Sequence, residues 1–230
     1  MILTGMKIHA ISDTHCKHSH YTMPGGDILV HSGDCTNHGW LEEAINFLNW
    51  FEKQDYSYLI LVPGNHDWIF ETHRALMEAE CRTRNITLLN DSGITIEGLN
   101  FWGSPVQPRY CDLAFNRDRG EDIRRHWDLI PVDTDILITH GPPAGILDVN
   151  PRGQMIGCHD LLQQINKTNV RLHIFGHIHW SRGHMKIGDK LFVNAASLSE
   201  QHQTVRGVPF RIKMNKSGIF TICESRKKQS

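Results

Sequence analysis

Five short polar motifs each follow an apolar, strand-like run, and this placement limits the folds open to the chain. Together the motifs carry seven side chains of the kinds that bind divalent metals. In an open α/β sheet, the loops after the strands' carboxyl ends converge at one edge. We therefore expect these side chains to meet at a single site. The motifs are Asp13-Thr14-His15, Gly33-Asp34, Gly64-Asn65-His66-Asp67, Thr139-His140-Gly141 and Gly176-His177-Ile178-His179.

Apolar runs and helical periodicity alternate along the chain. This alternation, with short turn-rich runs added, predicts an α/β fold of two mixed β-sheets packed as a sandwich and flanked by helices. Strands are expected at 7–12, 27–32, 58–62, 136–139 and 172–175, and helices at 41–51, 71–81, 122–127 and 159–167. Antiparallel sets are expected at 86–89, 94–97 and 99–102, and at 191–194, 210–214 and 218–222 with a hairpin turn at 215–218.

The spread of the motifs indicates one domain. The chain has 230 residues, and the motifs run from residue 13 to residue 179, so a single site needs most of its length. We expect one domain over 1–230, with a solvated or disordered tail at about 225–230 that contains Arg226-Lys227-Lys228.

The composition limits the binding partners and the cellular locations that we expect. The formal net charge is −1, so stable binding to nucleic acid is not expected. The six cysteines are scattered without a Cys-x-x-Cys pair, which favours free thiols in a reducing compartment. No window is apolar enough for a signal peptide or a membrane span, so we expect no membrane association and a cytoplasmic location. The sequence leaves the oligomeric state open.

The ligand types suit a pair of metal ions. One carboxylate can bridge two ions about 3.5–4 Å apart, and such a pair lowers the pKa of a bridging water. Imidazole and carboxamide ligands add no negative charge, so the pair stays cationic enough to attract a phosphate. Mixed oxygen and nitrogen ligands favour two divalent ions, Mn²⁺ above all, with Fe or Zn²⁺ as alternatives, over Ca²⁺.

His66 is the candidate general acid, because it lies between the ligand-type Asn65 and the acidic Asp67. We expect Asp67 to orient its imidazole, and Asn65 and His66 to contact the substrate. Other histidines have plainer roles. His9, His31 and His173 lie on strands and are expected to be structural, whereas a larger group is expected at the surface or in loops: His18, His20, His38, His73, His126, His159, His184 and His202.

These motifs resemble the signature of the calcineurin-like metallophosphoesterase superfamily: Asp-x-His, Gly-Asp, Gly-Asn-His-Asp/Glu, His and Gly-His-x-His, in this order. The resemblance extends between the motifs to the metallophosphoesterase-domain-containing (MPPED-type) branch. It rests on the segments 26–34, Gly103-Ser104-Pro105, 135–143 and 171–179. The loop from Gln107 to Gly120 matches that branch less well.

The resemblance implies a ligand set and an activity. One metal would take Asp13, His15, Asp34 and His179. The other would take Asp34, Asn65, His140 and His177, with Asp34 as the bridge. The implied reaction is hydrolysis of small phosphodiesters, cyclic nucleotides or related esters, by a metal-bridging hydroxide with His66 as acid. The expected partner is thus a small phosphate ester, with nucleotides among the candidates.

Other functions stay open at this point. A phosphomonoesterase or a nuclease could use the same site, although a nuclease fits poorly with the near-neutral charge. A scaffold or binding protein of the same fold is a different class, because fold does not dictate activity. Retention of all the ligand positions and of His66 argues against a scaffold. The His-x-His-x-Asp-His run of a metallo-β-lactamase-type hydrolase is absent.

Overall fold

Two mixed β-sheets of six strands each form the centre of the computed structural model, which describes residues 5–199, 201, 205 and 207–223. The first sheet has the order β14-β13-β1-β2-β3-β4, and the second has the order β11-β12-β10-β9-β6-β5. In each sheet the middle strands run parallel and the antiparallel pairs lie towards the edges. The expected fold class is confirmed. The tail expected at about 225–230 lies outside the described residues.

The strands of the first sheet are β1 (Lys7–Ile11), β2 (Gly26–His31), β3 (Tyr56–Leu61), β4 (Ile86–Leu88), β13 (Phe210–Met214) and β14 (Phe220–Ile222). Those of the second are β5 (Ser92–Ile96), β6 (Leu99–Ser104), β9 (Ile136–Thr139), β10 (Leu172–Phe175), β11 (Gly183–Ile187) and β12 (Lys190–Asn194). A separate two-stranded ribbon joins β7 (Gln107–Pro108) to β8 (Asn116–Arg117).

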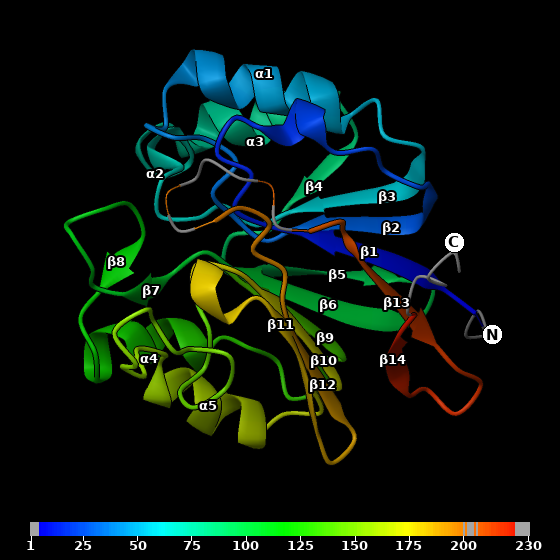
Figure 1. The fold of residues 1–230 in the computed structure, drawn as a ribbon, viewed down its shortest axis with the longest axis vertical. Coiled ribbons are helices and arrows are strands. Elements are labelled where there is room, and N and C mark those ends of the chain that lie inside the picture. Colours follow the sequence, from blue (N-terminus) through cyan, green and yellow to red (C-terminus); the bar gives the residue numbers. More distant parts are fainter. Residues whose placement is uncertain (1–4, 200, 202–204, 206, 224–230) are drawn as a thin grey trace, which may run out of the picture.

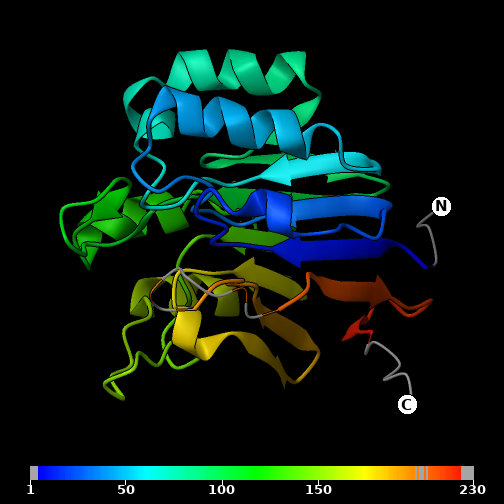
Figure 2. The same cartoon turned by 45° about the horizontal axis from the view of Figure 1, so that its top comes forward.

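Helices cover the outer face of each sheet (Figure 1). Those on the first sheet are α1 (Leu41–Phe51), α2 (Trp68–Thr72) and α3 (Arg74–Thr83), and α1 and α3 lie side by side above it (Figure 2). Those on the second are α4 (Glu121–Trp127) and α5 (His159–Asn166). Single 3₁₀ turns cover His18–His20 and His179–Ser181. Among the described residues, no helix is long and apolar enough to cross a bilayer.

Three apolar layers hold the sandwich together. Between the sheets, Val30 and Ile60 of the first pack with Ile138 and Ile174 of the second. A second layer joins the first sheet to α1 and α3, and a third joins the second sheet to α4 and α5. The strands β2, β3, β9 and β10 are therefore buried on both faces, which explains their unbroken apolar runs.

Several expectations about pairing were wrong. The run at 86–89 does not pair with 94–97: β4 lies parallel to β3, because α3 carries the chain back over the sheet in a strand–helix–strand crossover. β12 belongs to the second sheet, parallel to β10 and antiparallel to the unexpected β11, rather than to the set of β13 and β14. The hairpin turn at 215–218 is confirmed, with the Gly218 N–H donating to the Asn215 carbonyl at 3.0 Å.

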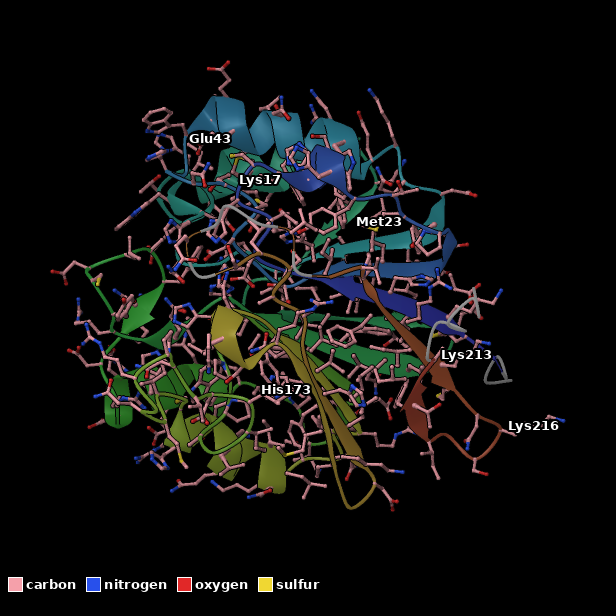
Figure 3. The ribbon with its side chains drawn as sticks, viewed as in Figure 1. Lys17, Met23, Glu43, His173, Lys213 and Lys216 are labelled. Carbon is pink, nitrogen blue, oxygen red and sulfur yellow. The ribbon has the colours of Figure 1, made fainter. Side chains whose placement is uncertain are left out.

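Two local expectations also need correction. The helix expected at 71–81 is broken at His73, where φ −127° and ψ 46° leave the helical region between α2 and α3. His18, expected at the surface or in a loop, lies in the segment between β1 and β2 but is buried there, with 3% of its surface exposed and a contact to Asn46 at 2.8 Å. The structural role expected of His173 agrees with its position inside the second half of the sandwich (Figure 3), where it contacts the Thr139 hydroxyl at 2.8 Å.

Candidate metal centre

All five motifs lie in loops that follow the carboxyl ends of parallel strands. The loops after β1, β2 and β3 come from the first sheet, and those after β9 and β10 come from the second. These ends point towards α2 and β7 at the left of Figure 1. The two sheets thus contribute to one site, as the motif positions predict.

The seven expected ligands meet there. One group unites Asp13, His15 and His179, and a second unites Asp34, His140 and His177. Within each group the candidate ligand atoms all lie within 4.8 Å of one another. Asn65 joins the second group, since its Oδ1 lies 2.8 Å from His140 Nε2. The expected division into two ligand sets is consistent with this grouping.

Asp34 lies between the two groups. Its Oδ2 is 3.3 Å from His140 Nε2 in one group and 3.8 Å from His15 Nε2 in the other. Its second oxygen accepts the main-chain N–H of His66 at 2.8 Å. A carboxylate placed between two sets of ligands has the geometry that bridging requires.

Main-chain carbonyls orient three of the ligand imidazoles. Nδ1 of His15 contacts the Thr36 carbonyl at 3.2 Å, and Nδ1 of His140 contacts the Ser32 carbonyl at 2.9 Å. Nδ1 of His179 lies 3.1 Å from the Leu198 carbonyl. A carbonyl only accepts, so each contact fixes the proton on Nδ1 and presents Nε2 as the ligand atom. Sequence inspection missed these carbonyls, because any residue type supplies one.

The charges of the site suit cations. Burial alone would raise the pKa of Asp13 and of Asp34, but His179 and His140 respectively hold these pKa values below their usual range. Burial also opposes the charging of His140, yet the Asp34 carboxylate raises its pKa to about 9. Loss of hydration lowers the pKa of His177 to about 3. At neutral pH the carboxylates are therefore ionised and His177 is neutral, which are the forms that bind metals, whereas His140 holds a second proton that a metal ion would have to displace.

Four of the ligands have strained backbone. Asp13, His15, Asp34 and His177 have φ values of 55°, 39°, 56° and 67°. A residue other than glycine in this region costs on the order of 1–3 kcal/mol, and such strain clusters at functional sites. Main-chain hydrogen bonds between the first two loops hold it in place, among them Asp13 N to Gly33 O at 2.8 Å and His15 N to Asp34 O at 3.0 Å.

Glycines let the loops approach closely, as expected for the residues before Asp34, Asn65 and His177. A Cβ at Gly64 would collide with Asp34, and one at Gly33 would collide with the His140 ring. A Cβ at Gly176 would collide with the Asp13 carboxylate and the Ser12 hydroxyl. The site therefore has no room for any side chain at these positions.

Gly176→Ala tests this close packing. We expect it to lower the free energy of unfolding by about 1–3 kcal/mol, because the added methyl must displace Asp13. We also expect it to weaken metal binding. Urea unfolding and metal content after dialysis measure the two effects. Gly183→Ala is the matched control, since a Cβ there meets nothing nearer than 3.7 Å. Equal behaviour of the two variants would contradict the packing argument.

The expected pairing of Asp67 with His66 is wrong. The Asp67 carboxylate accepts instead from Gly64 N at 2.8 Å, Thr36 N at 2.9 Å and Thr36 Oγ1 at 2.7 Å. It is fully buried and ties the Asn65-His66 loop to the loop that follows Asp34. The His66 imidazole contacts the Asn37 carbonyl through Nδ1 at 2.7 Å. His66 also lies with His15 and Asp34 in a third group of candidate ligand atoms within 4.8 Å.

The donor set fits a pair of divalent ions. Carboxylate, carboxamide and imidazole groups converge in a buried site whose histidines are already oriented, and no thiol is among them. A two-sheet sandwich with such a centre at its strand ends defines a class, the metal-dependent phosphoesterases.

Comparison with known proteins specifies the family. Residues 6–213 match the profile of the calcineurin-like phosphoesterase superfamily domain. The chain belongs to this superfamily. Two relatives support the MPPED-type branch. Human metallophosphoesterase domain-containing protein 1 is 35% identical over 218 residues, covering 85% of this chain and 67% of the relative. A UPF0046 protein of Caenorhabditis elegans is 36% identical over 210 residues, covering 86% and 72%.

Solved structures share the fold. The protein TT1561 of Thermus thermophilus superposes with a TM-score of 0.59 at 14% identity, over 96% of this chain and 99% of that one. Another crystal structure reaches a TM-score of 0.65 at 17% identity, with the same coverage. At such low identity the likeness concerns architecture alone.

Proposed function

We propose that the protein is a dinuclear metal-dependent phosphodiesterase that hydrolyses small phosphodiesters, cyclic nucleotides or related esters among them. The observation that carries the proposal is the position of Asp34 between two groups of candidate ligands, the buried Asp13, His15 and His179 on one side and the buried His140 with the part-buried His177 on the other. We further propose Mn²⁺ as the native metal, because the ligands mix oxygen and nitrogen without sulfur.

The metal ions and the protein side chains would have separate roles in this reaction. When bound, two divalent ions would activate a water and neutralise charge on the phosphoryl oxygens. The chain's own contribution is to hold carboxylates ionised and imidazoles oriented where the substrate phosphate arrives. Asn65 also faces this space through its contact with His140.

His66 supplies a proton donor. Its Nδ1 is engaged with the Asn37 carbonyl, so Nε2 is the ring nitrogen that can give a proton to the leaving oxygen. Its main-chain N–H donates to Asp34, which fixes the residue beside the candidate bridge. The residue is part-buried, so it keeps some exposure to solvent.

Other classes fit less well. A scaffold would have no need for oriented histidines or strained ligand loops. A nuclease would be expected to carry an extended basic surface, whereas this chain has a net charge of −1. A phosphomonoesterase remains the alternative on the same site. All six cysteines are free, which supports a cytoplasmic location.

Metal removal tests the proposal. Chelation and dialysis should abolish hydrolysis of bis(4-nitrophenyl) phosphate, and Mn²⁺ should restore it. Metal at about 100 times its Kd should stabilise the fold by about 2.7 kcal/mol, which raises Tm by roughly 5–10 °C for a chain of this size. Calorimetry with and without Mn²⁺ measures the shift. No turnover with any divalent metal, despite a metal-induced rise in Tm, would favour a binding protein.

A further inference from the structure

A cavity of about 450 Å³ opens beside the metal centre. One of its walls is His177, a candidate metal ligand, and Gly141, next to the ligand His140, forms another part. The remaining walls come from the segments 107–110 and 150–156 and from Arg119. A substituent on a phosphate held at the centre would therefore extend into this cavity.

The lining of this cavity is cationic. It includes Arg109, Arg119 and Arg152, and none of the described residues that line it is Asp or Glu. Arg109 is compensated by ion pairs with Asp118 at 2.7 Å and Asp112 at 3.1 Å. The other two arginines, Arg119 and Arg152, differ from Arg109 in their partners.

Arg119 and Arg152 form no ion pair with a carboxylate among the described residues. The Arg119 guanidinium donates to the carbonyls of Gly157 and Ile156, both at 2.8 Å, which fix its position without cancelling its charge. Arg152 has no ion pair within the described part of the chain and is exposed at the rim. The cavity thus presents two uncompensated positive charges, one of them held rigidly.

A buried amide in the cavity lining also points to a ligand. The Gln107 side chain lines the cavity, yet the residue is only 1% exposed. Neither Oε1 nor Nε2 has a hydrogen-bond partner among the described residues. A buried amide without partners is costly, so a polar group entering from the cavity would relieve it. Beside it, the Tyr110 ring lies 6.1 Å from the His177 ring and can pack against a flat substituent.

We propose that this cavity is a substrate subsite that selects phosphoesters whose substituent carries a second negative charge, a carboxylate or a further phosphate. Arg119 and Arg152 recognise that charge, and Gln107 accommodates the polar atoms nearer the scissile phosphate. The inference rests on the proposed function and narrows the substrate class of the same site: it favours phosphodiesters with a second charge over simple cyclic nucleotides, which carry one.

A matched pair of substrates tests it. In 4-carboxyphenyl 4-nitrophenyl phosphate and its 4-carbamoylphenyl counterpart, nitrophenolate leaves in both, and the retained arms differ chiefly in charge. We expect kcat/KM to be about fivefold higher for the carboxylate. The factor is modest because solvent weakens the attraction between exposed charges. Rising salt should shrink this ratio, because exposed charges are screened. The double variant Arg119→Gln/Arg152→Gln should bring the ratio close to one.

Arg125→Gln is the control. Arg125 is an exposed arginine on α4 that pairs with Asp122 and does not line the cavity, so this variant should keep the preference. Equal turnover of both esters by the native protein, or a preference that survives in the double variant, would overturn the subsite.

A failure of the proposed function gives a different result. If neither ester is hydrolysed with any divalent ion, the subsite is tested by calorimetric binding of 4-carboxyphenyl phosphate and 4-carbamoylphenyl phosphate to the Mn²⁺-treated protein. Tighter binding of the carboxylate that depends on Arg119 and Arg152 would support the subsite alone. Equal binding would reject it.

Discussion

Asp34→Ala is expected to remove bound metal and to lower the hydrolysis of a phosphodiester substrate by at least about 10³-fold, the largest effect that we predict. Among the described residues, Asp34 is the carboxylate that lies between both groups of candidate ligands. Its loss also leaves the buried His140 without the negative charge that raises its pKa. Metal content by elemental analysis and kcat/KM with bis(4-nitrophenyl) phosphate measure the two losses.

Asp135→Ala is the matched control. That carboxylate pairs with Arg171 at 2.6 Å and accepts from Asn100 N at 2.9 Å, away from the metal centre. We expect lower stability but unchanged metal content. An Asp34→Ala protein that still retained two ions would show that the bridge is assigned to the wrong residue.

His66→Ala should separate metal binding from proton donation. We expect metal content to stay nearly unchanged, since the contact from this residue to Asp34 is made by its main-chain N–H. Turnover of an alkyl phosphodiester should fall by about 10²–10⁴-fold, the usual contribution of general acid catalysis. A nitrophenyl ester should lose far less, because nitrophenolate leaves with little need of a proton.

The comparison of leaving groups is the decisive readout. A merely structural role for His66 would lower both rates by the same factor, and that result would contradict the acid assignment. His159→Ala serves as the control histidine, since it is an exposed residue at the start of α5. It should leave both rates as they are.

The ligand positions could be predicted because they depend on topology. Polar residues after buried strands must gather where parallel strands end, and Asp13, Asp34 and His140 do so although they are far apart in sequence. The same argument placed the close-packed glycines. The order of strands and motifs along the chain was sufficient for both predictions.

Contacts that depend on main-chain geometry could not be predicted. Asp67 was expected beside the His66 ring because the two are neighbours in sequence, but its carboxylate turns inward to Thr36 and Gly64. The Asn37 carbonyl contacts the His66 imidazole in the place where Asp67 was expected. Likewise, the short apolar run of β4 carries no mark of its partner, and its parallel pairing was decided by the helix before it.

The loop from 105 to 120 shows a third kind of limit. Its arginines and aromatic residues carry no periodicity, so the sequence could not tell solvated side chains from those of a cavity. Phe115 is buried in the core, whereas Tyr110 is 57% exposed beside His177. Arg117 forms an ion pair with Glu71 at 3.4 Å, whereas Arg119 lines the cavity.

Each half of the centre draws on both sheets. Asp13 and His15 follow a strand of the first sheet, and their neighbour His179 follows one of the second; Asp34 and Asn65 face His140 and His177 in the same way. Ions bound there would link two layers that otherwise meet through apolar side chains and a few hydrogen bonds, such as the one between His140 and the Ser32 carbonyl. Sliding of one layer over the other would then be resisted by coordination bonds. Bound metal ions would thereby make the two-sheet sandwich stiffer against such sliding.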